Sequence, residues 1–146
     1  MNVAAPNLRF RAARERLGMS PEELAMRSGV VSADVWEIEG LENDLTVFYS
    51  LRDVQKFCRV LGIRPIELFG DDVAEPAVSV EELVQRIHEE CRSRGVTLAQ
   101  FDDGVGGCLS ECIEPPERLL SDMKVIGLQW LCQELRMDWR RVLVNL

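Results

Sequence analysis

The stretch from Ser20 to Glu39, SPEELAMRSGVVSADVWEIE, restricts the fold of this 146-residue chain more than any other. Ser20 is a natural helix N-cap, and the proline after it suits the first helical position, where its missing N–H costs nothing. Glu23 completes the pattern of a capping box. Gly29 then interrupts the helical spacing, and a second helix is expected over Ser32 to Gly40. The sequence therefore predicts two short helices joined by a tight glycine turn.

Apolar residues at helical spacing predict further helices on both sides of this stretch. Before it, Phe10, Ala13 and Leu17 recur on one face of a helix that Gly18 ends. After it, the sequence predicts a long connector, a helix and a short helix, over residues 41–49, 50–62 and 65–70. The helix over 50–62 has one apolar face, formed by Leu51, Val54, Phe57, Cys58 and Leu61.

The second half of the chain repeats this order of elements, with a long helix capped by Ser79 and then a helix that has a threonine cap, Thr97, and a glycine turn after it. A shift of 77 positions aligns residues 18–29 with residues 95–106, and a shift of 74 positions aligns residues 51–68 with residues 125–142. Few identities support either alignment, so the repeat rests on the order of helices. Asp102 falls where Ala25 would pack two helices together, and prolines cut the third helix of this half short. The expected organisation is a first domain, a linker and a degenerate second domain, over residues 1–70, 71–78 and 79–146.

Residues 8–70 resemble the DNA-binding domain of Cro/cI-type proteins, the phage-repressor-like or XRE family of helix-turn-helix proteins. The matching positions are Leu24, Ala25, Gly29, Val35, Ile38 and Glu39, followed by LGIRPIELFG. The resemblance implies an all-α fold of tandem five-helix units, the second one degenerate. It also implies an ion pair between Arg14 of the first helix and Glu39 at the end of the third. The corresponding positions in the second half are Cys91 and Pro116, so both charges are absent there together.

The resemblance further implies that the helix over 32–40 would enter the major groove of DNA. Its outward positions are Val31, Ser32, Ala33, Trp36 and Glu37. None of these is the arginine, asparagine or glutamine that usually reads bases, although Ser32 and Ala33 could touch a base or a phosphate. The basic residues that could contact the DNA backbone are Arg9, Arg16 and Arg27.

The charge of the chain opposes that role. No basic residue lies between Arg27 and Arg52, and the acidic residues in this interval are Asp34, Glu37, Glu39, Glu42 and Asp44. The formal net charge is -8, from 17 basic and 25 acidic residues. Because phosphate contacts supply much of the affinity for DNA, a uniformly basic nucleic-acid surface is excluded.

Two functions therefore remain open. The first is a non-enzymatic transcriptional regulator that binds DNA through its first half. The alternative is a protein-interaction module, antitoxin-like or a regulatory adaptor, that keeps the helix-turn-helix fold without binding DNA. Trp36 favours the alternative as an interface anchor, unless it folds back over the core near residues 47–49. A protein partner or self-association is expected, and the second half could be a built-in dimerisation partner, since such repressors usually bind as dimers.

The candidate metal ligands are His88, Cys91, Cys108, Cys112 and Cys132. Their spacing matches no recognised zinc knuckle, and small buried side chains explain the cysteines without a metal, so no cofactor is predicted. No nucleophile–base pair is visible, and neither an enzyme nor a small-molecule substrate is expected. MNVAAPNLRF lacks the apolar region of a secretory signal, and no apolar run approaches the ~20 residues of a membrane span. The sequence thus predicts a cytoplasmic protein with reduced thiols and no membrane partner.

Overall fold

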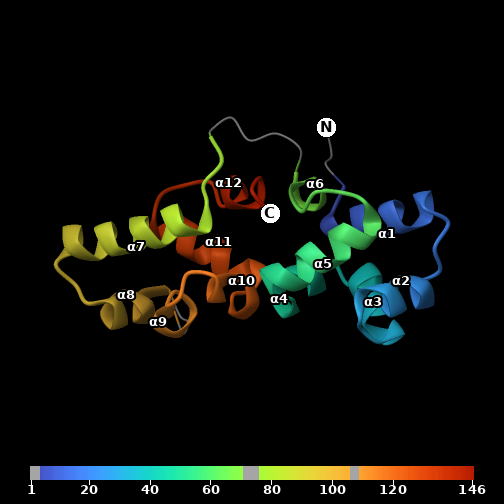
Figure 1. Ribbon diagram of the computed structural model, residues 1–146, viewed down its shortest axis with the longest axis horizontal. Helices are drawn as coiled ribbons and strands as arrows, with labels where there is room; N and C mark the ends of the chain where they lie inside the picture. The colour runs from blue at the N-terminus through green and yellow to red at the C-terminus, as the bar shows by residue number, and fades with distance from the viewer. Residues whose placement is uncertain (1–3, 71–75, 106–108) are drawn as a thin grey trace.

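The computed structural model describes residues 4–70, 76–105 and 109–146, and within them the protein is all-α (Figure 1). The helices of the first half are α1 (Pro6–Arg16), α2 (Pro21–Ser28), α3 (Ser32–Gly40), α4 (Asp44–Phe48), α5 (Leu51–Leu61) and α6 (Ile66–Phe69). Those of the second half are α7 (Val80–Arg94), α8 (Leu98–Val105), α9 (Leu109–Cys112), α10 (Arg118–Asp122), α11 (Val125–Glu134) and α12 (Arg140–Leu143). None of the described helices is long and apolar enough to cross a membrane.

Local capping fixes the ends of α2. Ser20 Oγ accepts a hydrogen bond from the Glu23 backbone N–H at 3.1 Å. The Glu23 carboxylate pairs with Arg27 at 2.6 Å instead of returning to Ser20, so the predicted capping box is only half formed. Gly29 ends the helix with φ 74°, a left-handed conformation that glycine adopts without steric cost.

Two expectations for the first half are wrong. Leu17 is the C-cap residue of α1 and is 48% exposed, so the inward face ends with Ala13 because the helix ends at Arg16. The connector over residues 41–49 is not a long loop, since α4 lies within it and buries Leu45 completely. Between residues 4 and 70, the described part of the first half, there are therefore six helices instead of five. The predicted apolar face of α5 is confirmed, with all of its members buried: Leu51, Val54, Phe57, Cys58 and Leu61.

The second half begins with two capped helices. Ser79 Oγ accepts a hydrogen bond from the Glu82 backbone N–H at 3.1 Å and starts α7. Thr97 and Gln100 exchange hydrogen bonds of 2.8 and 3.2 Å and start α8, as the threonine cap predicts. The turn expected after α8 includes residues 106–107, which lie outside the described residues.

The helices of the two halves have corresponding boundaries. A shift of 74 carries α4 onto α10 and α6 onto α12 with the same first and last residues, and it carries the start of α5 onto the start of α11. A shift of 77 carries α2 onto α8 and the start of α3 onto the start of α9. The shift falls from 77 to 74 between the start of α9 and the start of α10. In this interval the second half is shorter, since α9 has four residues where α3 has nine.

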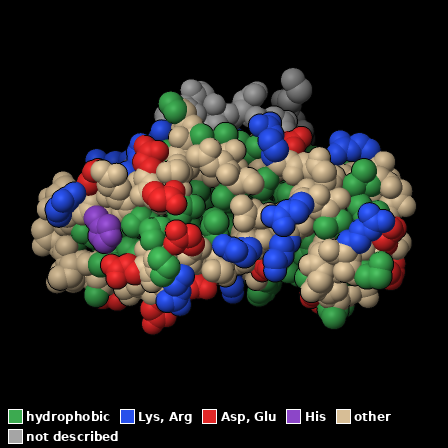
Figure 2. Space-filling view, viewed as in Figure 1, with side chains coloured by type: hydrophobic (Ala, Val, Ile, Leu, Met, Phe, Trp, Pro, Cys, Tyr) green, Lys and Arg blue, Asp and Glu red, His purple; other side chains and the backbone are tan. Residues whose placement is uncertain are grey.

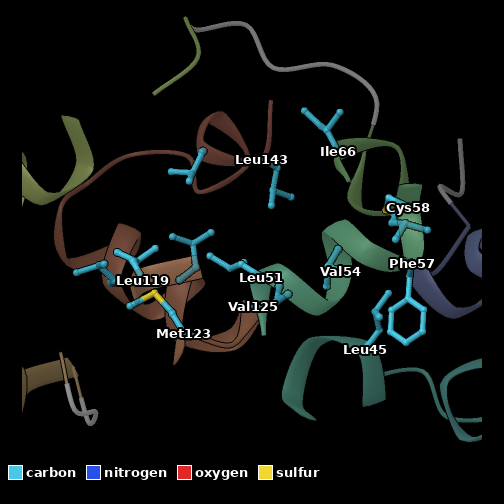
Figure 3. Close-up of a cluster of buried hydrophobic side chains, with 14 of the residues drawn as sticks. Leu45, Leu51, Val54, Phe57, Cys58, Ile66, Leu119, Met123, Val125 and Leu143 are labelled. Carbon is cyan, nitrogen blue, oxygen red and sulfur yellow. The ribbon is translucent and has the colours of Figure 1, made fainter. Parts of the chain in front are cut away.

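The two halves share one continuous core. Figure 1 shows α1, α2 and α3 at one end of an elongated molecule, α8 and α9 at the other, and α5, α10 and α11 between them. In the middle, α5 packs on α10 and α4 packs on α11. Figure 3 shows Leu51 and Val125 within this central cluster, and both side chains are fully buried.

The end of the predicted linker is fixed to the last helix. The Val78 N–H donates to the Arg141 carbonyl at 3.0 Å, and Arg141 Nε donates to the Pro76 carbonyl at 2.8 Å. Val78 itself is fully buried. Residues 76–78 are therefore part of the packed structure, and residues 71–75 lie outside the described residues.

Candidate recognition surface

A buried ion pair holds α3 against α1. Arg14 Nε lies 2.5 Å from Glu39 Oε1, and Arg14 Nη2 lies 3.0 Å from Glu39 Oε2. The two side chains are only 10% and 7% exposed. Their hydrogen bonding raises the pKa of the Arg14 guanidinium, against the opposing effect of burial. The pairing is bidentate, which fixes orientation as well as distance, so the end of α3 has a defined position on α1.

Two further hydrogen bonds reinforce this ion pair, and we call the pair together with these bonds the Arg14–Glu39 brace. Arg14 Nη1 donates to the Met19 carbonyl at 2.7 Å, which ties the pair to the loop before α2. Asn7 Nδ2 donates to the Glu39 carbonyl at 3.1 Å. On the inner side of α3, Val35 and Ile38 are fully buried. The opposite side of the helix is therefore presented to solvent in one fixed orientation.

That outward side is apolar and acidic. Trp36 is 57% exposed and Val31 is 63% exposed. Ala33 and Glu37 are also exposed, while Ser32 is half-buried. Trp36 is thus more than half exposed, which favours a role in recognition over a role as a cover of the core near residues 47–49.

Carboxylates of α3 and of neighbouring elements act together on Tyr49. Burial, and after it the negative charges of four neighbours, together raise the pKa of Tyr49 to about 12; the four neighbours are Asp34, Asp44, Glu37 and Asp53. These carboxylates disfavour the phenolate because they add negative potential at its oxygen. An anionic ligand on α3 would likewise meet the negative charges of Asp34 and Glu37.

The basic residues expected to contact phosphate lie mostly in contacts with the protein itself. Arg9 Nη1 donates to the Glu67 carbonyl at 2.8 Å and Arg9 Nε to the Ala4 carbonyl at 3.1 Å. Arg27 is paired with Glu23 at 2.6 Å. Arg16 is exposed at the end of α1.

One basic surface was not predicted. Arg52, Lys56 and Arg59 are spaced four and three residues apart, so they share one face of α5. All three are exposed, and none forms an ion pair with a residue of the described ranges. Figure 2 shows Lys and Arg side chains gathered over α5. Lys56 and Arg59 also border an open depression of about 320 Å³ at the end of α2. The spacing was visible in the sequence, but the lack of partners needed the structure.

The equivalent surface of the second half is reduced. α9 is four residues long and precedes Pro115 and Pro116, as the prolines predict. Buried Asp102 accepts a hydrogen bond from the Leu109 backbone N–H at 2.7 Å. The carboxylate at the position of Ala25 therefore caps the first turn of α9 instead of packing two helices together.

The cysteines within the described ranges are buried free thiols: Cys58, Cys91, Cys112 and Cys132. Burial raises the pKa of Cys58 and of Cys132 to about 12, which keeps both thiols protonated near neutral pH. Since the thiolate is the metal ligand, these two are poor donors. No group of three potential ligands lies together in the described part of the chain, His88 is exposed, and Cys108 lies outside that part.

Comparison of the chain with protein-family models, with curated proteins and with solved structures finds no match. A functional assignment therefore depends on the residues and the geometry described above. The feature that they define is a rigidly held, solvent-facing α3 with an exposed tryptophan among carboxylates.

Proposed function

We propose that this chain is a non-enzymatic regulatory protein with a Cro/cI-type helix-turn-helix fold, and that it acts by binding a protein partner through α3. The exposure of Trp36 carries this proposal. A tryptophan offers a large contact area and loses little conformational entropy on binding, and tryptophan is enriched among the residues that dominate interface energies. The Arg14–Glu39 brace supports the proposal because it orders the helix before any partner arrives.

The charge around Trp36 indicates the chemistry of the partner. Asp34 and Glu37 belong to the same helix as Trp36, and together with Asp44 and Asp53 they make the surroundings of Tyr49 negative. A complementary partner would have an apolar pocket for the indole and a rim of lysine or arginine side chains. DNA is the less suitable occupant, because its phosphates would face these carboxylates.

Trp36→Ala is expected to weaken partner capture strongly without unfolding the protein. The immobilised full-length chain would be exposed to an extract of its source cells, and retained proteins would be quantified by mass spectrometry. Trp130→Ala is the matched control, because Trp130 is also exposed, at 48%, but lies on α11. Loss of a hot-spot tryptophan costs about 2 kcal/mol or more, so retention of the true partner should fall about 30-fold with Trp36→Ala only.

The stability of both variants should stay within about 0.5 kcal/mol of the parent, since both positions are exposed. A set of retained proteins that responds equally to the two substitutions, or to neither, would remove the role assigned to Trp36.

DNA binding through the first half is the second candidate, and the row of exposed cations on α5 favours it. These cations are exposed and could contact backbone phosphates. If they do, random duplex DNA should bind at low salt, and log K should fall with log salt by about 0.9 per phosphate contact.

A fluorescence anisotropy titration would separate the two candidates. Our proposal expects no binding to random duplex DNA at low salt. Binding that Arg52→Gln and Lys56→Gln weaken, and that Trp36→Ala leaves unchanged, would instead establish the DNA candidate.

A further inference from the structure

The contact between the two halves joins residues that correspond to each other. Ser50 and Lys124 form an antiparallel bridge, and the Leu51 N–H donates to the Met123 carbonyl at 2.9 Å. The two bridged residues are separated by 74 positions, the same shift that carries α5 onto α11. Each is also the N-cap residue of its helix. Antiparallel pairing of two equivalent residues is the arrangement that a two-fold axis between them produces.

The helix contacts obey the same symmetry. The 74-residue shift relates α4 to α10 and α5 to α11, so it converts the contact between α5 and α10 into the contact between α11 and α4. Both contacts are present. The shift also relates α6 to α12, and these two helices pack on each other, as Figure 1 shows near the middle of the molecule.

We infer that the molecule is an internal pseudo-dimer, with a two-fold axis that passes between Ser50 and Lys124. The second half occupies, on the first half, the place that an identical chain would take in a symmetric dimer. The side chains at this contact, among them Leu51 and Val125, are fully buried. A second copy of the chain therefore has no access to this surface. The second half of the same chain covers it instead.

The two halves of this pseudo-dimer are unequal at the recognition surface. α3 has nine residues, whereas the equivalent helix α9 has four. The first half also has the Arg14–Glu39 ion pair, whereas the equivalent positions of the second half are the uncharged residues Cys91 and Pro116. A symmetric dimer of helix-turn-helix units presents two recognition helices to its target. This chain presents one, and so it binds one partner molecule per chain. That stoichiometry, though not the internal symmetry, rests on the proposed function.

A pair of cysteines on the axis tests the inference in the full-length protein. The hydrogen bond from Leu51 to Met123 makes Ser50 and Lys124 a non-hydrogen-bonded antiparallel pair, in which Cα atoms lie about 4.5 Å apart. Disulfides span Cα distances of about 4.4–6.8 Å. The variant carrying Ser50→Cys and Lys124→Cys should therefore form an intramolecular disulfide with oxidised glutathione, which accepts the two electrons. Non-reducing electrophoresis and mass spectrometry would show a cross-linked monomer at every protein concentration.

The control is a second equivalent pair placed away from the axis. Lys56 and Trp130 also differ by 74 positions, and both are exposed. Each lies six residues further along its helix, which is about 9 Å at 1.5 Å per residue. The variant carrying Lys56→Cys and Trp130→Cys should give no intramolecular cross-link.

Failure of the axial pair to cross-link in a protein with unchanged circular dichroism, or cross-linking only between chains, would overturn the internal pseudo-dimer. Either result would leave the proposed function untouched, because the cysteine pair does not involve α3. Failure of the Trp36 experiment would likewise leave the internal symmetry standing.

Discussion

Replacing Arg14 by alanine is expected to lower the free energy of unfolding by about 3–5 kcal/mol, because the substitution leaves Glu39 buried without a partner. The Glu39 side chain is only 7% exposed, so water cannot replace the guanidinium. Urea denaturation followed by circular dichroism would measure the loss. Glu39→Ala should cost a similar amount for the converse reason, since it leaves the Arg14 cation buried.

Two comparisons show whether the effect comes from the buried charge. Arg27→Ala breaks the pair with Glu23, whose side chains are 55% and 37% exposed, and should cost no more than about 1 kcal/mol. The double substitution Arg14→Met and Glu39→Leu removes both charges and should recover most of the stability lost in either single variant. If Arg14→Ala costs no more than Arg27→Ala, then the pair does not fix α3.

The sequence predicted the helices whose ends are marked by local chemistry. Ser20, Gly29, Ser79 and Thr97 each define a cap or a turn through contacts within a few residues, and the boundaries of α2, α7 and α8 follow from them. α4 was missed for the converse reason. Its N-cap residue, Asn43, makes no side-chain capping bond, and the helix is fixed by the burial of Leu45 in the core.

The candidate site was predictable in its residues but not in its electrostatics. The outward position of Trp36 follows from helical spacing, because Val35 and Ile38 occupy the inner face. Its exposure does not follow, since an indole can fold back over neighbouring apolar side chains. The combined effect of Asp34 and Asp44 on Tyr49 also needed the structure, because these carboxylates belong to different helices.

The contact between the halves could not be read from local patterns at all. The alignment with a shift of 74 suggested a repeat, yet it gave no indication that Ser50 and Lys124 would meet each other. A bridge between residues so far apart depends on how two units pack, and spacing along the chain gives no information on packing between units. The structure adds this contact, and with it the reason why the two halves share a core.

The shared core predicts that the two halves unfold together. Leu51 lies at the contact and is fully buried, and the Phe69 ring of the first half lies 5.2 Å from the Trp139 ring of the second half. Truncation of a fully buried leucine costs about 2–5 kcal/mol. Leu51→Ala should therefore lower the urea midpoint of both halves by the same amount, although the substitution lies in only one of them.

Tryptophan fluorescence can follow each half separately. Trp36 reports on the first half when Trp130 and Trp139 are replaced by phenylalanine, and Trp139 reports on the second half when Trp36 and Trp130 are replaced. Coincident transitions in the two backgrounds, shifted equally by Leu51→Ala, are expected of one cooperative unit. Leu41→Ala is the control, because Leu41 is 54% exposed and its loss should shift neither transition measurably. Two separate midpoints, with only the first displaced by Leu51→Ala, would mean that each half is stable without the other and that their contact adds little to the fold.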